Sequence, residues 1–533
     1  MSLYPLCLSQ GYARDVIDVV EDDTGKTVKA LLYRGTPDNP AFWKRVLLDL
    51  QYAAAVISVA IGPSGPNDVY LNNLHEFLTN AAKHSSDAAF ALANHSGDYH
   101  TGQLASMIKA LQTELRPYFL FGAGSNEYNQ LLLNSINKEE VYEMNEVLLA
   151  VPRQQNSNDN PKSIHAGGGH SALLTNNGDL YLWGWNDSNQ LGRGKEPVGE
   201  TVDDSPLLNV AQPLSNIKVE TADLGHNHTL VIEKGTGRLF GFGENGRGQV
   251  SGSVSDSDTT ANNHMVQTPV GLEDECFIDV AAGLFHSAAI TNQGELITWG
   301  CGRFGQCLTP ANSEKTTVGR WQPNDGSKLL KVACGRRHTV VLDEYGRIWT
   351  LGDNKYGQLG RLRDDSDREP QLVDGPLGQV NSGCFAVYSG WSHILALSRD
   401  TEDSDACILH GWGRNDKGQL GSIPGSSQSY ISIPQVLNGS LKVQAACCGS
   451  ESSHVVDLEG KILSTGWNEH GNLGIGHYDQ QSDDKTSESS STWMATTGTR
   501  VVAPPSTNRK GEEKTKILLA AGGAHLIAMA VTP

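Results

Sequence analysis

The chain has no long apolar run, no run of basic residues and no cysteine pairs at metal-binding spacing. Its most apolar window, AAAVISVAIG, is too short to span a membrane. The first residues, MSLYPLCLSQGY, lack the basic start and the apolar core of a secretory signal. The formal net charge of −19 disfavours nonspecific attraction to nucleic acid or to anionic membranes. We therefore expect no nucleic-acid partner and no membrane partner.

The nine cysteines are an odd number and show no CxxC spacing, which indicates a reducing compartment and no zinc knuckle. We expect a cytoplasmic or nuclear protein with no bound metal and no cofactor. Cys447 and Cys448 are adjacent in a predicted strand and should point to its opposite faces. We interpret both as small apolar strand residues.

Glycine is abundant, with 58 among 533 residues, and much of it belongs to a repeated turn. The turn has the form G-x-[NG]-x-x-[GN]-Q-L, as in GDNKYGQLG, and its copies begin at Gly124, Gly184, Gly243, Gly300, Gly352, Gly413 and Gly466. Successive copies lie 52 to 61 residues apart, which suits a unit of four strands. The glutamines of the turn (Gln130, Gln190, Gln249, Gln306, Gln358 and Gln419) are expected to bond the local backbone.

A second module, G-x-x-H between two apolar runs, precedes most copies of the turn. Its histidines are His170, His228, His286, His338, His393 and His525, and Ser452 replaces a further one. Each could suggest a metal ligand or a catalytic residue. Recurrence at equivalent repeat positions favours instead a structural hydrogen bond between strands.

The two modules also predict how the repeat array closes. The turn at Gly124 has no GxxH module before it, and the GxxH module with His525 has no turn after it. The two halves complete one unit if the C-terminal strands pair with the N-terminal strand, which leaves no open sheet edge. We therefore predict a mainly β fold: a seven-bladed β-propeller over residues 117–533 with one blade closed by both termini. The β-rich stretches LYLWGW, LITWG, IWTLG and ILHGWG fit its strands.

This two-module repeat resembles the regulator of chromosome condensation family. Within it, AGGGHSALLTNNGDLYLWG, YSGWSHILAL and GWNEHGN look like two kinds of small cytosolic member: the secretion-regulating guanine nucleotide exchange factor-like proteins and the diphthamide- and elongator-associated proteins. The resemblance implies a protein partner, either a small GTPase or a small zinc protein. The family's plant ultraviolet-B photoreceptor clusters tryptophans from repeated GWRH segments, whereas Trp391 alone lies in such a segment here, which disfavours photoreception.

Some aromatic residues break the equivalence of the repeats. Trp391, Trp412 and Trp467 are either packed inside the blades or exposed as anchors for a partner, and packing is the more common role. His470, within GWNEHGN, departs from the other turns and is a further candidate for partner binding.

The first hundred residues have a different character. VIDVV and TVKALLY read as two strands joined by a turn, followed by helices at RVLLDLQYAAAVISVA and DVYLNNLHEFLTNAAKH. Residues 98–116 read as a helical linker, with a helix over 103–115. The segment 1–97 resembles the C-terminal half of the ChaC-like γ-glutamylcyclotransferases, through QGYARDVIDV, KALLYRGTPDNP and GPSGPNDVYLNNLHEFL.

That family converts glutathione to 5-oxoproline and Cys-Gly, and the resemblance carries its conserved GY onto Gly11 and Tyr12, a remnant of the substrate site. The family's essential glutamate precedes this GY, and Leu6, Leu8 and Ser9 stand there instead, so no catalytic residue is expected. FGAGS at Phe121 could be the family's substrate loop moved downstream, although the propeller count assigns it to a strand.

Two functions follow as hypotheses. The first is a protein-interaction propeller, acting as an exchange factor-like regulator or as a partner in tRNA and diphthamide modification. The alternative is a glutathione-specific γ-glutamylcyclotransferase, if an upstream segment supplies the missing catalytic half.

Overall fold

The computed structural model describes residues 15–21, 27–32, 115–132, 139–152, 160–192, 209–210, 212–214, 217–252, 271–308, 318–362, 369–400, 406–421, 429–437, 441–476, 489–496 and 516–531. These residues are mainly β-strand, with one short 3-10 helix, η2 (Pro376–Gly378), among them. In this part of the chain no helix is long and apolar enough to cross a membrane. The helices expected before residue 115 lie outside the described residues.

The N-terminal hairpin is present. Strand β1 (Asp15–Glu21) pairs antiparallel with β2 (Thr27–Leu32), in agreement with the two strands expected there. Further along, the sequence predicts a linker helix up to residue 115, but Leu115 opens strand β3, so the strand begins before Pro117.

Each repeat unit forms an antiparallel sheet, and the strands of the first sheets follow the chain. They are β5 (Pro161–Ala166), β6 (His170–Thr175), β7 (Leu180–Gly184) and β9 (Gln212–Pro213), then β10 (Val219–Leu224), β11 (His228–Glu233) and β12 (Leu239–Gly243). Next come β13 (Phe277–Ala282), β14 (His286–Thr291), β15 (Leu296–Gly300) and β16 (Gly319–Trp321), then β17 (Leu329–Cys334), β18 (His338–Asp343), β19 (Ile348–Gly352) and β20 (Gln371–Leu372).

The following two units are joined into one larger sheet because β23 also pairs with β25. Their strands are β21 (Cys384–Ser389), β22 (His393–Arg399), β23 (Cys407–Arg414) and β24 (Tyr430–Val436), then β25 (Lys442–Cys448), β26 (Ser452–Asp457), β27 (Ile462–Trp467) and β28 (Ser489–Ala495). The expected strand LITWG is β15, and IWTLG is β19. The expected strand ILHGWG lies within β23.

The last sheet combines both ends of the array. Strands β29 (Lys516–Ala521) and β30 (His525–Val531) are followed in space by β3 (Leu115–Ser125), β4 (Glu140–Pro152) and β8 (Asn209–Val210). The pairing of β3 with β30 sets Leu120 opposite Met529 and Gly124 opposite His525. FGAGS is therefore an internal strand segment, bonded to β30 on one side and to β4 on the other.

Gly124 shows why this strand needs glycine. Its φ is +108°, in the region that L side chains rarely adopt, and a Cβ there would strike the backbone of Ala524 and His525. This glycine serves a close backbone approach at the joined ends.

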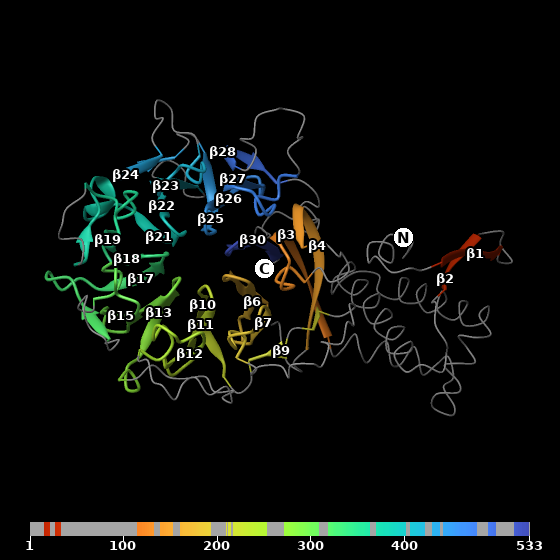
Figure 1. Cartoon of the computed structure of the whole chain (residues 1–533), viewed down its shortest axis with the longest axis horizontal. Coiled ribbons are helices and arrows are strands. Elements are labelled where there is room, and N and C mark those ends of the chain that lie inside the picture. Colours follow the sequence, from red (N-terminus) through yellow and green to blue (C-terminus); the bar gives the residue numbers. More distant parts are fainter. Residues whose placement is uncertain are drawn as a thin grey trace, which may run out of the picture.

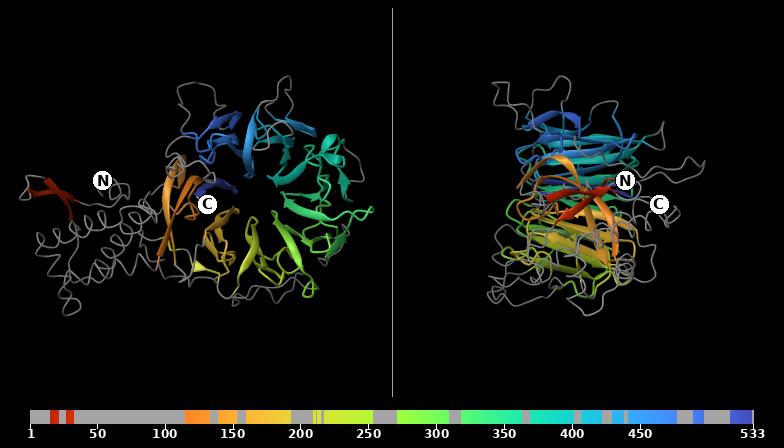
Figure 2. Two further views of the ribbon diagram at one scale, coloured as in Figure 1. Left: turned by 180° about the vertical axis from the view of Figure 1, so that it is seen from behind. Right: turned by 90° about the vertical axis from the view of Figure 1, so that its right-hand side faces the viewer.

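The sheets follow one another round a centre, as Figure 1 shows, and the view from behind in Figure 2 has the same order. The first strands β5, β10, β13, β17, β21, β25 and β29 contact one another in this order, and β29 contacts β5.

The core lies between neighbouring sheets. Leu182 of β7 and Phe242 of β12 belong to one buried cluster, and Leu230 of β11 belongs with Trp299 of β15 to the next. Cys447 packs in one cluster and Cys448 against another, so these two residues do face opposite sides of β25. The described cysteines are all free.

Candidate partner-binding face

The two sequence modules meet at one end of the sheets. In the first complete sheet His170 pairs with Gly184, so the GxxH loop before β6 lies beside the turn after β7. The same pairing recurs, for example between His338 and Gly352. We call the end of the ring that carries these loops and turns the loop face.

On the loop face the GxxH loops surround a central opening. Its lining includes Gly167, Gly225, Gly283, Gly335, Gly390, Gly449 and Gly522, the first glycine of each loop. Backbone hydrogen bonds tie most of these loops to the next, as from Trp391 N to Ser450 O (2.9 Å) and from Gly523 N to Gly167 O (2.9 Å). The opening therefore has a rim of joined backbone.

The GxxH histidines cross the boundaries between repeat units, which we call seams. Each ring uses Nε2 to bond a hydroxyl of the following unit, as in His170 to Thr229 (3.0 Å) and His228 to Ser287 (3.0 Å). The other pairs are His286 with Thr339, His338 with Ser389, His393 with Ser453 and His525 with Ser171. All six side chains are buried. This geometry is that of a structural element of the repeat.

In four of these pairs the hydroxyl also fixes the tautomer of the histidine. Ser287 Oγ donates to Gln249 O (2.6 Å), and Thr229, Thr339 and Ser171 donate in the same way to turn carbonyls. A hydroxyl that gives its proton to a carbonyl must accept from the ring, so Nε2 carries the hydrogen. The bare Nδ1 has no partner in any of the six.

Burial makes these rings neutral. It lowers the pKa of His170, His228 and His338 to about 3, and that of His286, His393 and His525 to about 4. A second proton would go onto Nδ1, which has no acceptor. In the described part of the chain no group of three or more His, Cys, Asp or Glu side chains could hold a metal ion.

The turn glutamines bond the local backbone, as expected. Gln306 Oε1 accepts from Phe304 N (2.8 Å), and Gln358 Oε1 accepts from Tyr356 N (2.7 Å). The same bond, from the backbone N–H two residues earlier to the side-chain oxygen, is made by Gln130, Gln190, Gln249 and Gln419.

Trp412 is not a partner anchor, which corrects one candidate from the sequence. Its side chain is 0% exposed, and its indole Nε1 donates to Gln358 O across a seam (3.1 Å). Trp183 and Trp299 make the equivalent bond to Gln130 O and Gln249 O. The tryptophan in the third strand of these units is therefore a seam residue.

Trp391 and Trp467 lie elsewhere on the loop face, and both are half-buried. Trp391 lines the central opening, and the guanidinium of Arg336 lies 5.2 Å from the centre of its ring. Trp467 makes an edge contact with His470, with ring centres 5.6 Å apart. The structure does not bring Trp391 together with Trp467 and His470.

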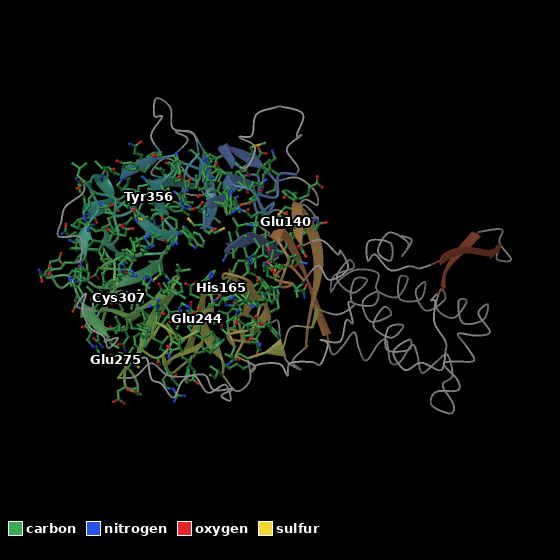
Figure 3. All side chains as sticks on the ribbon, viewed as in Figure 1. Glu140, His165, Glu244, Glu275, Cys307 and Tyr356 are labelled. Atoms are coloured by element: carbon green, nitrogen blue, oxygen red, sulfur yellow. The ribbon has the colours of Figure 1, made fainter. Side chains whose placement is uncertain are left out.

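His470 joins the turn after β27 to strand β4. Its Nδ1 lies 2.9 Å from Glu140 Oε1, and the single O–H of Tyr142 is within hydrogen-bond distance of both the other oxygen of this carboxylate and Glu469 O. Burial and Glu140 together raise the pKa of Tyr142 to about 12. In Figure 3 Glu140 lies at strand β4, away from the central opening.

Gly11 and Tyr12 lie outside the described residues, so the remnant of the cyclotransferase site is not placed. The sequence interpretation also missed two polar features. His165 in β5 lies beside the central opening in Figure 3, and burial lowers its pKa to about 4. The second is a group of arginines on aromatic rings, which the structure assembles from CGRFG and CGRRH.

Comparison with known proteins gives two family matches. Residues 119–528 match the model of the RCC1-like domain, and residues 7–97 match that of the ChaC-like proteins. The first match covers most of the chain and includes the sheets and loops described above.

Individual relatives carry the same repeat. The ultraviolet-B receptor of Arabidopsis thaliana is 30% identical over 59% of this chain and 67% of its own length. The secretion-regulating guanine nucleotide exchange factor of Mus musculus is 28% identical over 78% of this chain and 84% of its own length.

Among solved structures, Prp20p of Saccharomyces cerevisiae, described with its binding to Gsp1p and histones, is similar to this chain in fold. It has a TM-score of 0.58 and 17% identity, over 79% of this chain and 93% of its own. At that identity the likeness shows the fold alone. Repeat, fold and family model agree, and the chain belongs to the RCC1-like domain family.

Proposed function

We propose that this propeller binds a protein partner on its loop face and regulates it in the manner of a guanine nucleotide exchange factor. The observation that carries the proposal is the convergence of the GxxH loops and turns around one opening, where Trp391 and Arg336 remain accessible. Loops held on a rigid scaffold are the usual place for binding residues.

Two lines support the finer parts of this proposal. The exchange factor of Mus musculus matches over most of both chains. We further infer seven blades over residues 117–533, one of them closed by both termini. The loops around the opening and the pairing of β30 with β3 support that inference. The boundaries 1–97 and 98–116 for the preceding segments, and a cytoplasmic or nuclear location, belong to the same proposal.

A second finer role is that of a partner in tRNA and diphthamide modification, with a small zinc protein bound in place of a GTPase. Glutathione cleavage is not part of the proposal. Leu6, Leu8 and Ser9 stand where the family's glutamate is expected, and FGAGS is an internal strand segment of the propeller.

Affinity purification of the full-length chain from its own cells, followed by nucleotide-release kinetics, tests the proposal. We expect a small GTPase whose bound fluorescent GDP leaves faster when the chain is added. Recovery of a small zinc protein, with no effect on any nucleotide, would favour the second role. Recovery of neither partner would refute both.

A further inference from the structure

Five residues of the loop face form one continuous group of arginines and aromatic rings. Arg337 lies 4.0 Å from the ring centre of Phe304, Arg303 lies 5.7 Å from the same ring, and Arg336 lies 5.2 Å from that of Trp391. A backbone bond from Arg336 N to Trp391 O (3.1 Å) ties the two halves together. We call Arg303, Phe304, Arg336, Arg337 and Trp391 the arginine–aromatic patch.

The patch carries positive charge that the described residues of this chain do not neutralise. Within the described residues no carboxylate forms an ion pair with Arg303, Arg336 or Arg337. By contrast, Arg238, Arg320, Arg347 and Arg414 each pair with one or two carboxylates of the chain. Asp353, whose backbone N bonds Arg337 O, accepts from Lys355 N instead.

The accessibility of these groups suits an interface. Arg303 and Arg336 are exposed, whereas Arg337, Phe304 and Trp391 are half-buried. The N–H groups of a guanidinium lie in its own plane. When the guanidinium is stacked on an aromatic face, these groups stay free to bind a carboxylate through two parallel hydrogen bonds. Arginine and tryptophan are also the residues that most often dominate binding energy at protein interfaces.

The charge of the whole chain helps to choose the partner. At −19 the molecule repels a long polyanion such as nucleic acid, which carries one charge about every 1.7 Å of duplex. A short acidic segment can bring its carboxylates to within about 8 Å of the arginines of the patch. At that distance physiological salt does not screen their attraction.

Building on the proposed function, we infer that the arginine–aromatic patch is the docking site for an acidic segment of the protein partner. Carboxylates of that segment pair with Arg303, Arg336 and Arg337. Phe304 and Trp391 hold the guanidinium groups in place and cover the apolar part of the contact.

The test uses a fluorescein-labelled octaglutamate peptide and the full-length chain, with binding followed by fluorescence anisotropy. Arg336→Glu/Arg337→Glu reverses two charges of the patch. The matched control is Lys234→Glu/Lys328→Glu, which makes the same charge change at exposed residues on the opposite end of the strands. Arg336→Lys/Arg337→Lys keeps the charge and removes the planar fork.

We expect the peptide to bind the unmodified chain and to bind the charge-reversed patch variant at least tenfold more weakly. The control should stay within about twofold, and the lysine variant should bind about threefold more weakly. No binding to the unmodified chain, equal loss in the control, or tighter binding of an eight-nucleotide single-stranded RNA would overturn the inference. A dimer that the patch substitutions dissociate in sedimentation would assign the patch to a second copy and also overturn it.

The same variants separate this inference from the proposed function. If the charge-reversed variant recovers the cellular partner as well as the unmodified chain does, the patch is not the docking site and the proposed function stands. If the unmodified chain recovers no partner, the proposed function fails, while the peptide titration still decides whether the patch binds acidic segments.

Discussion

The seams of the ring are not all alike, and the sharpest contrast is between the seam at His286 and the one at Ser452. At the first, His286 bonds Thr339 of the next sheet, and Thr339 bonds Gln306 O. At the second, Ser452 stands at the histidine position, and Leu526 takes the place of the hydroxyl. Ser452 bonds His454 of its own strand, which bonds Ser464, so this polar chain stays within one sheet.

Other contacts hold the seam at Ser452. Ser450 N donates to Gly522 O (3.0 Å), and Ser450 Oγ donates to Gly523 O. Further out, His470 pairs with Glu140. The comparison shows that the repeated histidine joins sheets and that a seam without it can be held by backbone bonds and rim contacts. A catalytic or metal-binding histidine would not be replaceable in this way.

The largest expected effect is acid unfolding driven by the histidine seams. The unfolded histidines bind protons below about pH 6.5, whereas the folded ones do so only near pH 3 to 4. Stability is therefore present above pH 6.5 and is lost as the pH falls below it. Each histidine lowers the free energy of unfolding by up to about 1.4 kcal/mol per pH unit, and all six together lower it by up to about 8 kcal/mol per pH unit.

Asp223 offsets the uptake of one of these protons. Burial raises its pKa in the folded chain to about 7, so the folded chain binds this proton at a higher pH than the unfolded chain does. Urea unfolding measured from pH 8 to pH 5 checks the slope. A curve that is flat across this range would show that the rings are not neutral in the folded chain. His228→Gln should remove about one proton of the uptake, whereas Ser452→Ala should leave it unchanged.

Replacing the glycine that packs against a seam histidine by alanine should give the next largest loss in the free energy of unfolding. In Gly335→Ala the new Cβ meets the ring of His338 and lies 2.7 Å from Gly390 O, so we expect a loss of about 3 kcal/mol. In Gly449→Ala the Cβ meets only the small Ser452 side chain closely, and Gly522 O lies 3.2 Å away. Its loss should be less than half as large, and equal losses in urea titrations would contradict the comparison.

Removal of the histidine itself should cost somewhat less. His286→Ala deletes the bond to Thr339 and leaves a cavity at a fully buried position, so we expect about 2 to 3 kcal/mol. Ser452→Ala removes one bond within a sheet and should cost about 1 kcal/mol. The comparison would fail if the serine variant unfolded at the lower urea concentration.

The hydroxyl positions should show the smallest effects. Ser287→Ala leaves His228 Nε2 without its partner and Gln249 O with the bond from Trp299 alone, and should cost about 1 to 2 kcal/mol. Ser287→Thr should cost much less, since Thr229 and Thr339 fill equivalent positions. Equal losses for alanine and threonine would show that packing, and not the hydroxyl, matters there.

Much of the repeat could be predicted from the sequence because its signals are local and recur. The GxxH module begins the second strand of a unit, and the turn glycine lies opposite its histidine, as His228 lies opposite Gly243. The side-chain bonds of the turn glutamines span two residues and were predictable for the same reason.

The features that the sequence did not reveal depend on neighbouring sheets. Trp412 is buried because its indole N–H reaches Gln358, 54 positions away. The arginine–aromatic patch joins residues from three units, so no single window displays it. In both cases the deciding contact crosses a seam, and local patterns carry no information about it.

Hydrogen–deuterium exchange of the full-length chain with its purified partner tests most directly that the loop face is the binding surface. The account predicts slower exchange in the segments around Arg303 and Phe304, Arg336 and Arg337, and Trp391. The ends of the strands near Lys234 and Lys328 should be unchanged. Protection confined to those opposite ends, with the loop face unaffected, would contradict it.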